Sequence, residues 1–169
     1  RELGPEIDTF GKVPAASLIR LHMDPEPPMP GKGDGVLVDA LDAAAIDAIV
    51  AVAGPGTDSP LVMVELRQLG GALRERKPGA GALGSLDGSF ALFAMGVPMG
   101  PAVAEAIESR LEALKGALAP WSRGKPYLNF AEKRAAIGDA IGAEAFARLE
   151  RIKASVDPEG RFRSGHAFA

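Results

Sequence analysis

Near its C-terminal end the sequence places a phenol and a carboxamide two positions apart, between apolar residues. If residues 125–130 are extended, Tyr127 and Asn129 project to one side, opposite their apolar neighbours. A carboxamide offers both hydrogen-bond donors and an acceptor, which recognition of the edge of a heterocycle requires. The segment is therefore a candidate binding element, and a structural hydrogen-bonding pair is the alternative interpretation.

A second polar pair lies within the apolar stretch of residues 61–69 (LVMVELRQL). The alternation predicts a strand on which Glu65 and Arg67 occupy one face and aliphatic residues the other. Gly70 and Gly71 follow directly and would let a ligand approach the backbone closely. Two interpretations stay open: a substrate pocket lined by Glu65 and Arg67, or a solvent-exposed ion pair that contributes under about 1 kcal/mol.

Other chemistries are not favoured by the residue types present. His22 and His166 lack the short spacing of metal-ligating histidines, so structural roles and no metal site are predicted. The sequence has no cysteine, which excludes disulfides and thiolate chemistry. The glycines of 54–56 and 79–84 are predicted turn residues, because a dinucleotide fingerprint requires strand, glycines and helix in that order. A GxSxG nucleophile motif is lacking as well.

The composition is that of one domain of ordinary size. The 169 residues carry a formal net charge of −3 and the basic residues are scattered, so no nucleic-acid surface is predicted. No apolar run reaches the roughly 20 residues needed to cross a bilayer, so no membrane span is predicted. The sequence begins at Arg1, with neither a methionine nor a signal peptide. We therefore expect a cytoplasmic protein and a fragment of a longer one.

Strands and helices are predicted to alternate along the chain. Apolar alternation and short apolar runs predict strands, and a 3.6-residue period predicts helices. The predicted strands are 16–23 (or an extended arm), 35–41, 61–69 and 89–97, and the predicted helices are 42–53, 101–119 and 143–155. Because the strands are few and two of them are neighbours across a short glycine-rich excursion, we expect an antiparallel sheet with helices on one face. The predicted fold class is α+β.

Each predicted helix carries an apolar stripe that we expect to face the core. Asp42 is predicted to cap the first helix, and Asp157-Pro158 to end the last. The stripes, in chain order, are Ile46, Ile49, Val50 and Ala53, then Val103, Ile107, Leu111, Leu114 and Leu118, then Ala145, Leu149, Ile152 and Val156.

Three C-terminal segments resemble, in order and spacing, the signature of berberine-bridge-like flavin oxidases. That signature has a Tyr-x-Asn-Tyr element, a helix ending in a lysine, and an Asp-Pro-x-x-x-Phe element. The corresponding segments here are Tyr127–Phe130, Arg148–Lys153 and Asp157–Phe162. Residues 21–25 and 64–72 also resemble segments of bacterial members, so the likeness covers most of the chain.

The resemblance implies a substrate domain, an antiparallel sheet backed by helices, that covers the isoalloxazine ring of FAD. By resemblance, Asn129 and Tyr127 contact the flavin ring region, Tyr127 borders the reacting centre as a catalytic base, and residues 157–162 pack structurally. Phe130 departs from the commoner tyrosine, so any role of that hydroxyl is lost. The chain lacks a glycine-rich anion-binding segment and a candidate sequence for tethering the flavin, which implies that the N-terminal FAD-binding domain is absent.

The expected organisation has two parts. Residues 1–120 form the sheet and helices of the substrate domain, with 1–12 a ragged start, and residues 121–169 form a C-terminal segment packed on the same domain. The intact parent is expected to be an FAD-linked oxidoreductase that oxidises a small alcohol, amine or sugar-like substrate by hydride transfer to the flavin. The alternative is a non-catalytic binding or oligomerisation module of the same fold.

The expected partners are the missing FAD-binding domain and a small-molecule substrate. We expect the isolated chain to bind FAD poorly, because most of the anchoring surface belongs to the absent domain. Loss of that domain is also expected to leave Leu69, Phe130 and Trp121 facing water. A homodimer through the former domain interface would cover them. Whether this chain alone is an enzyme stays open.

Overall fold

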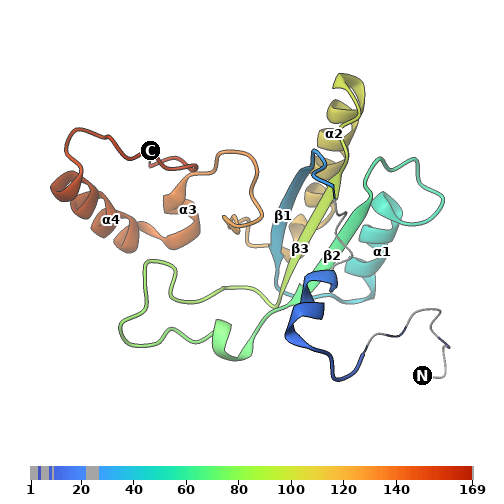
Figure 1. Ribbon diagram of the computed structural model, residues 1–169, viewed down its shortest axis with the longest axis horizontal. Helices are drawn as coiled ribbons and strands as arrows, with labels where there is room; N and C mark the ends of the chain where they lie inside the picture. Colours follow the sequence, from blue (N-terminus) through green and yellow to red (C-terminus); the bar gives the residue numbers. More distant parts are fainter. Residues whose placement is uncertain (1–3, 5–7, 9, 22–26, 169) are drawn as a thin grey trace.

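The computed structural model describes residues 4, 8, 10–21 and 27–168. At its centre is a three-stranded antiparallel sheet in the order β1-β3-β2 (Figure 1). The strands are β1 (Lys32–Val38), β2 (Met63–Gln68) and β3 (Phe90–Gly96). The predicted α+β class and antiparallel sheet are confirmed, and β1 begins earlier than predicted.

Helices precede, separate and follow the strands. The three predicted helices are confirmed, whereas α3 and the short 3-10 helices were not predicted. The strand predicted at 16–23 is wrong, because residues 15–20 form an exposed 3-10 helix and residues 22 and 23 lie outside the described residues. The elements are η1 (Ala15–Arg20), α1 (Ala43–Ala53), η2 (Gly71–Leu73), α2 (Pro101–Ala117), η3 (Ala119–Trp121), α3 (Ile137–Ile141) and α4 (Ala143–Val156).

The main core lies between one face of the sheet and the helices α1 and α2. Four of the five residues of the predicted α2 stripe are buried, and only Val103 is exposed, at 36%. Gly96 of β3 lets α2 come close, since a Cβ there would lie 2.7 Å from the Ile107 side chain. The buried cluster comprises Val36, Val38, Ala45, Leu92, Ala94, Ile107, Leu111, Leu114 and Leu118.

The stripe predicted for α1 is wrong by about one residue. Ile46 and Val50 are half exposed, and the helix packs instead through Ala45, Ile49 and Val52. Ala45 is fully buried, and so small a side chain lets the helix backbone approach its neighbours closely. The predicted cap is confirmed, because the Asp42 carboxylate accepts a hydrogen bond from the Ala45 N–H at 2.8 Å.

The opposite face of the sheet carries a smaller cluster, formed by Leu37, Ala91 and Phe130. Phe130 comes from the C-terminal segment and is only 9% exposed, so the prediction that it faces water is wrong. Trp121 also packs against the core, and its indole N–H donates to Asp42 at 3.1 Å. Leu69 is partly buried against the smaller cluster.

The helices α3 and α4 lie to one side of the sheet, away from α1 and α2 (Figure 1). Helix α4 has no buried residue, so the prediction that its stripe faces a core is wrong in this chain: Ile152 is 46% and Val156 73% exposed. The predicted end of α4 is confirmed. Asp157 is buried there and accepts hydrogen bonds from the backbone N–H groups of Arg161 and Phe162, which turns the chain back.

Candidate functional site

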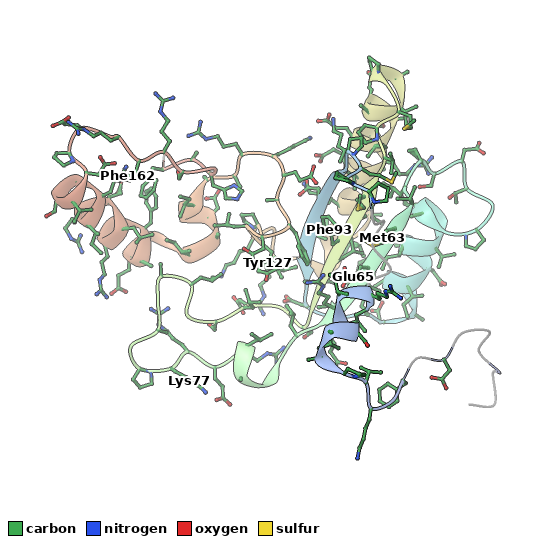
Figure 2. The ribbon with its side chains drawn as sticks, in the orientation of Figure 1. Met63, Glu65, Lys77, Phe93, Tyr127 and Phe162 are labelled. Carbon is green, nitrogen blue, oxygen red and sulfur yellow. The ribbon has the colours of Figure 1, made fainter. Side chains whose placement is uncertain are left out.

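The two polar pairs singled out in the sequence meet on the sheet face opposite α1 and α2. The guanidinium of Arg67 lies over the ring of Phe130, 5.0 Å from its centroid. The Phe130 ring in turn meets Tyr127 edge-on, with centroids 4.8 Å apart. Tyr127 lies between the C-terminal helices and the sheet that carries Glu65 and Phe93 (Figure 2). Residues distant in sequence thus form one cluster, here called the open-face cluster: Glu65, Arg67, Phe93, Tyr127, Asn129 and Phe130.

The segment that carries Tyr127 and Asn129 is a turn, so the predicted extended conformation is wrong. The N–H of Phe130 donates to the carbonyl of Tyr127 at 2.9 Å, which closes the turn. The two polar side chains still meet, because the Asn129 amide donates to the Tyr127 hydroxyl at 3.2 Å. The turn places the Phe130 ring against the sheet, and burial of this apolar ring stabilises the turn. An extended segment would leave the ring exposed to water.

Two residues that sequence reasoning missed make room for this turn. Gly35 of β1 has no side chain, and a Cβ there would lie 2.7 Å from the Phe130 Cβ. Phe93 of β3 stands opposite Gly35 and packs on the Phe130 ring with centroids 4.9 Å apart. The alternation of glycine within the run Lys32–Val38 was the available signal, because glycine inside a strand marks a close approach of another segment.

Glu65 and Arg67 are neighbours on one face of β2, as the strand alternation predicts. Their side chains form a two-point ion pair, which includes a 3.1 Å contact between Arg67 Nη2 and Glu65 Oε2. This hydrogen-bonded pairing raises the pKa of Arg67. Glu65 orients the guanidinium over the aromatic ring, where a cation is attracted by the electron-rich face.

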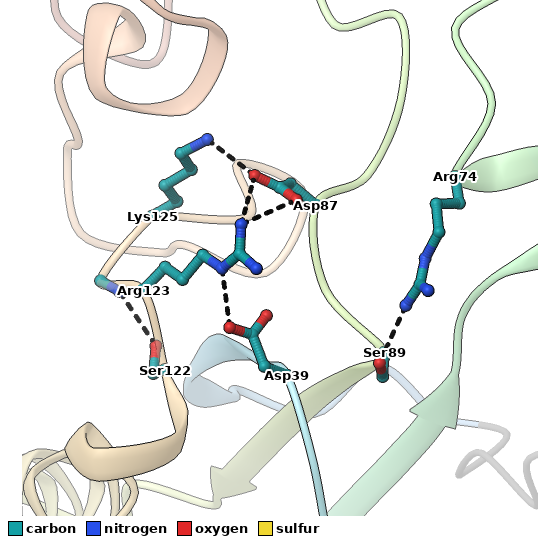
Figure 3. Close-up of polar contacts among 8 residues, drawn as sticks. Asp39, Arg74, Asp87, Ser89, Ser122, Arg123 and Lys125 are labelled. Atoms are coloured by element: carbon teal, nitrogen blue, oxygen red, sulfur yellow. Dashed lines mark hydrogen bonds and ion pairs between the residues drawn. The ribbon is translucent and has the colours of Figure 1, made fainter.

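A network of charged residues holds the chain immediately before the turn (Figure 3). Arg123 binds Asp39 at 2.7 Å and Asp87 at 3.3 Å, and Lys125 binds Asp87 at 3.0 Å. Asp39 follows β1 and Asp87 precedes β3, so the network ties the segment to both strands. The hydrogen bond from Lys125, with the charge of Arg123, lowers the pKa of Asp87. These ion pairs fix the position of the chain that leads into Tyr127.

The open-face cluster combines an aromatic surface, an amide, a phenol and a guanidinium on a partly exposed face. Such a surface can stack against a flat heterocycle, donate and accept hydrogen bonds at its edge, and exchange a proton at the Tyr127 hydroxyl. Two cavities lie elsewhere: one of about 280 Å³ beside Asp34 and Lys115, and one of about 850 Å³ beside α4. The cluster is therefore better described as one wall of a site.

Other site types find no support in the described residues. They contain no group of three or more side chains that could hold a metal ion. His166 holds the end of the chain against the earlier part of the C-terminal segment. Its Nδ1 accepts a hydrogen bond from the Ala135 N–H at 3.4 Å, and its Nε2 lies 3.1 Å from the Leu128 carbonyl oxygen. His22 lies outside the described residues. Within the described part of the chain, no helix is long and apolar enough to cross a membrane.

Comparison with known proteins finds similarity in structure. No protein-family model and no curated protein matches the sequence. Among solved structures, wild-type BBE-like 1 of Physcomitrella patens matches with a TM-score of 0.71 and 16% identity, over 88% of this chain. An Asp-to-Asn variant of the same protein matches with a TM-score of 0.68 and 17% identity, again over 88%. This chain spans 32% of each of those chains, so the likeness establishes a fold shared with part of a longer protein.

Proposed function

We propose that this chain is the substrate domain and C-terminal segment of an FAD-linked oxidoreductase of the berberine-bridge-like type. The observation that carries the proposal is the convergence of Glu65, Arg67, Tyr127 and Asn129 on one face of an antiparallel sheet. The fold shared with BBE-like 1 supports the same function. The proposed organisation is residues 1–120 as the sheet and helices, and residues 121–169 as the segment that packs on them.

The chemistry of the open-face cluster fits the ring portion of a flavin. The half-buried rings of Phe93 and Tyr127 offer aromatic surface, and the Asn129 amide offers the donors and acceptor that the polar edge of the ring requires. In the intact enzyme FAD would supply a hydride acceptor for the oxidation of the substrate. Asn129 and Tyr127 would hold the ring from this side, and the absent domain would hold the rest of the cofactor.

The proposed substrate is a small organic alcohol, amine or sugar-like molecule placed beside Tyr127. The Tyr127 oxygen, in its deprotonated form, would take the proton from the substrate O–H or N–H, and the hydride from the adjacent carbon would pass to the flavin held by the absent domain, so that a carbonyl or imine forms. Asn129 orients the phenol through its 3.2 Å hydrogen bond. Glu65 and Arg67 would line the substrate side and orient polar groups of the substrate. We propose a cytoplasmic location for the intact protein.

The decisive experiment uses the longer polypeptide encoded by the gene that contains this segment. We expect that polypeptide to purify with a flavin absorption band, and to oxidise at least one alcohol, amine or sugar in a broad screen with oxygen or an artificial acceptor. A polypeptide that begins near Arg1 in its natural form and carries no flavin would favour the alternative, a non-catalytic binding or oligomerisation module.

A further inference from the structure

The tail of the chain, residues 158–168, follows α4 and returns to the segment that precedes α3 (Figure 1). The Ala167 N–H donates to the Ala135 carbonyl at 2.8 Å, and the Ala167 carbonyl accepts from the Ile137 N–H at 2.9 Å. The ring of Phe168 packs beside an aromatic ring of α4, with centroids 6.0 Å apart. The end of the tail is therefore held by contacts that do not involve the His166 side chain.

The imidazole of His166 connects this tail to the turn that carries Tyr127 and Asn129. Its Nδ1 accepts a hydrogen bond from the Ala135 N–H at 3.4 Å, so the proton of the neutral ring is on Nε2. The Leu128 carbonyl oxygen, 3.1 Å from Nε2, can only accept a hydrogen bond, so the Nε2–H donates to it. The two backbone partners thus require the same neutral tautomer, and both ring nitrogens are hydrogen-bonded.

The carbonyl that His166 binds belongs to the peptide unit between the two polar side chains of the open-face cluster. Leu128 lies between Tyr127 and Asn129, so a displacement of its carbonyl displaces the backbone of both neighbours. The buried ring of Phe130 anchors the turn on the sheet side, and His166 anchors it on the tail side. Two anchors from different directions restrict the turn more than the Phe130 ring alone would.

We propose that His166 is a positioning residue for Tyr127 and acts through the Leu128 carbonyl. The inference rests on the proposed function, in which the Tyr127 oxygen takes the substrate proton. A base must lie within hydrogen-bond reach of the proton that it takes, and a misplacement of about 1 Å can lower a rate roughly a hundredfold. This role goes beyond the structural one that the sequence predicts for His166, and every contact that carries it lies within this chain.

Tyr127 is the only tyrosine of the sequence, so a 3-fluorotyrosine label gives the 169-residue protein a single fluorine NMR resonance that reports on its surroundings. Three variants separate the two hydrogen bonds of the imidazole. In His166→Gln the amide nitrogen replaces Nε2 and can still donate to the Leu128 carbonyl, whereas His166→Asn reaches only the place of Nδ1 and His166→Ala keeps neither bond. We expect the resonance to move in the asparagine and alanine variants and to stay near the wild-type position in the glutamine variant.

The matched control is Phe162→Ala, which truncates a largely exposed side chain of the same tail and should leave the resonance unmoved. Far-UV circular dichroism verifies that each variant is folded. A resonance that does not move in His166→Ala, or that moves equally in all three His166 variants, would overturn the proposal, and this test requires no flavin.

The functional counterpart is measured in the full-length parent. His166→Asn should lower kcat roughly tenfold with KM nearly unchanged, and His166→Gln should retain most of kcat. An unchanged kcat for His166→Asn would also overturn the proposal. A parent that carries no flavin would contradict the proposed function instead, and the fluorine resonance of the 169-residue protein would still decide whether His166 positions Tyr127.

Discussion

Arg67 connects the two halves of the candidate site. Its guanidinium is held by Glu65 on the same strand and lies over the Phe130 ring, which itself contacts Tyr127. The sequence marked Glu65 and Arg67 as a pair, but their link to Tyr127 depends on the turn that brings Phe130 onto the sheet.

Replacing Tyr127 with phenylalanine in the full-length parent should lower kcat more than it raises KM. The ring and its packing on Phe130 are preserved, and only the hydroxyl is removed, the group that we propose takes the substrate proton in the transition state. Steady-state kinetics, with the flavin content normalised by absorbance, would measure the changes in kcat and KM. Asn129→Ala is the companion variant, and it should weaken or misplace the flavin while leaving the fold intact. An unchanged kcat for Tyr127→Phe would return the hydroxyl to a structural role.

At the scale of elements, ion pairs join the sheet, α2 and the C-terminal segment. Asp34 of β1 is 6% exposed and binds Lys115 of α2 at 2.7 Å. Glu108 of α2 binds Lys32 of β1 at 2.6 Å and Lys133 of the C-terminal segment at 2.7 Å. One face of α2 is therefore the electrostatic junction of the molecule, while its other face fills the core.

Removing Lys115 should destabilise the fold, because the Asp34 carboxylate would remain buried without its cation. We expect Lys115→Met to lower the free energy of unfolding by about 1–3 kcal/mol. Lys115 is itself a third exposed, so the upper values for fully buried pairs do not apply. The double variant Asp34→Leu/Lys115→Met should recover part of the loss.

Lys125→Met is the matched control for this series, since it breaks an exposed pair with Asp87 and should cost under about 1 kcal/mol. Urea denaturation followed by circular dichroism measures all three variants. If Lys115→Met and Lys125→Met lose the same stability, the burial of Asp34 has no energetic consequence.

Low pH should weaken the ion pairs that Glu108 forms with Lys32 and Lys133. Hydrogen bonds from Lys133 and Lys32 lower the pKa of Glu108 from 4.5 to about 2. A carboxylate whose pKa is lower in the folded state stabilises the fold above pH 4.5 and loses that contribution as the pH falls toward 2. The difference in the free energy of unfolding between wild type and Glu108→Gln should therefore be present at neutral pH. It should disappear as the pH falls from 4.5 to about 2. A difference that is constant with pH would contradict the lowered pKa.

At the scale of the whole molecule, apolar surface is left uncovered at places other than those predicted. Trp121 and Phe130 are packed, whereas α4 exposes Ile152 and Val156, and η1 exposes Ile19 at 82%. The open-face cluster covers one part of the sheet only, and a second domain could lie against it. A homodimer remains a prediction for the isolated chain, and light scattering across micromolar concentrations would reveal it.

The isolated chain should bind FAD weakly. The open-face cluster offers contacts to a ring but forms only one wall of a site, so few of the interactions needed for tight binding are available. Titration of FAD with the 169-residue protein, followed by flavin fluorescence, measures the affinity. The variant Asn129→Ala serves as the control, because any weak specific binding should depend on that amide. Tight stoichiometric binding by this chain alone would contradict the prediction that the absent domain anchors the cofactor.

The sequence by itself determined the elements with strong local signals. Apolar alternation predicted β2, a continuous apolar run predicted β3, the stripe of α2 predicted its buried face, and Asp42 predicted the start of α1. These signals are local, because periodicity and capping depend on residues within a few positions of one another. The same reasoning marked Tyr127 and Asn129 from their side-chain chemistry.

Only the tertiary structure decided what these elements contact. The buried face of α1 differs from the predicted stripe, because the small Ala45 allows close packing of the helix. The predicted stripe of α4 is not buried against any core in the described part of the chain. The turn at Phe130 formed because Gly35 opens a space on a strand far away in sequence. Burial is a property of pairs of surfaces, so a single sequence pattern identifies an apolar face without naming the surface that covers it.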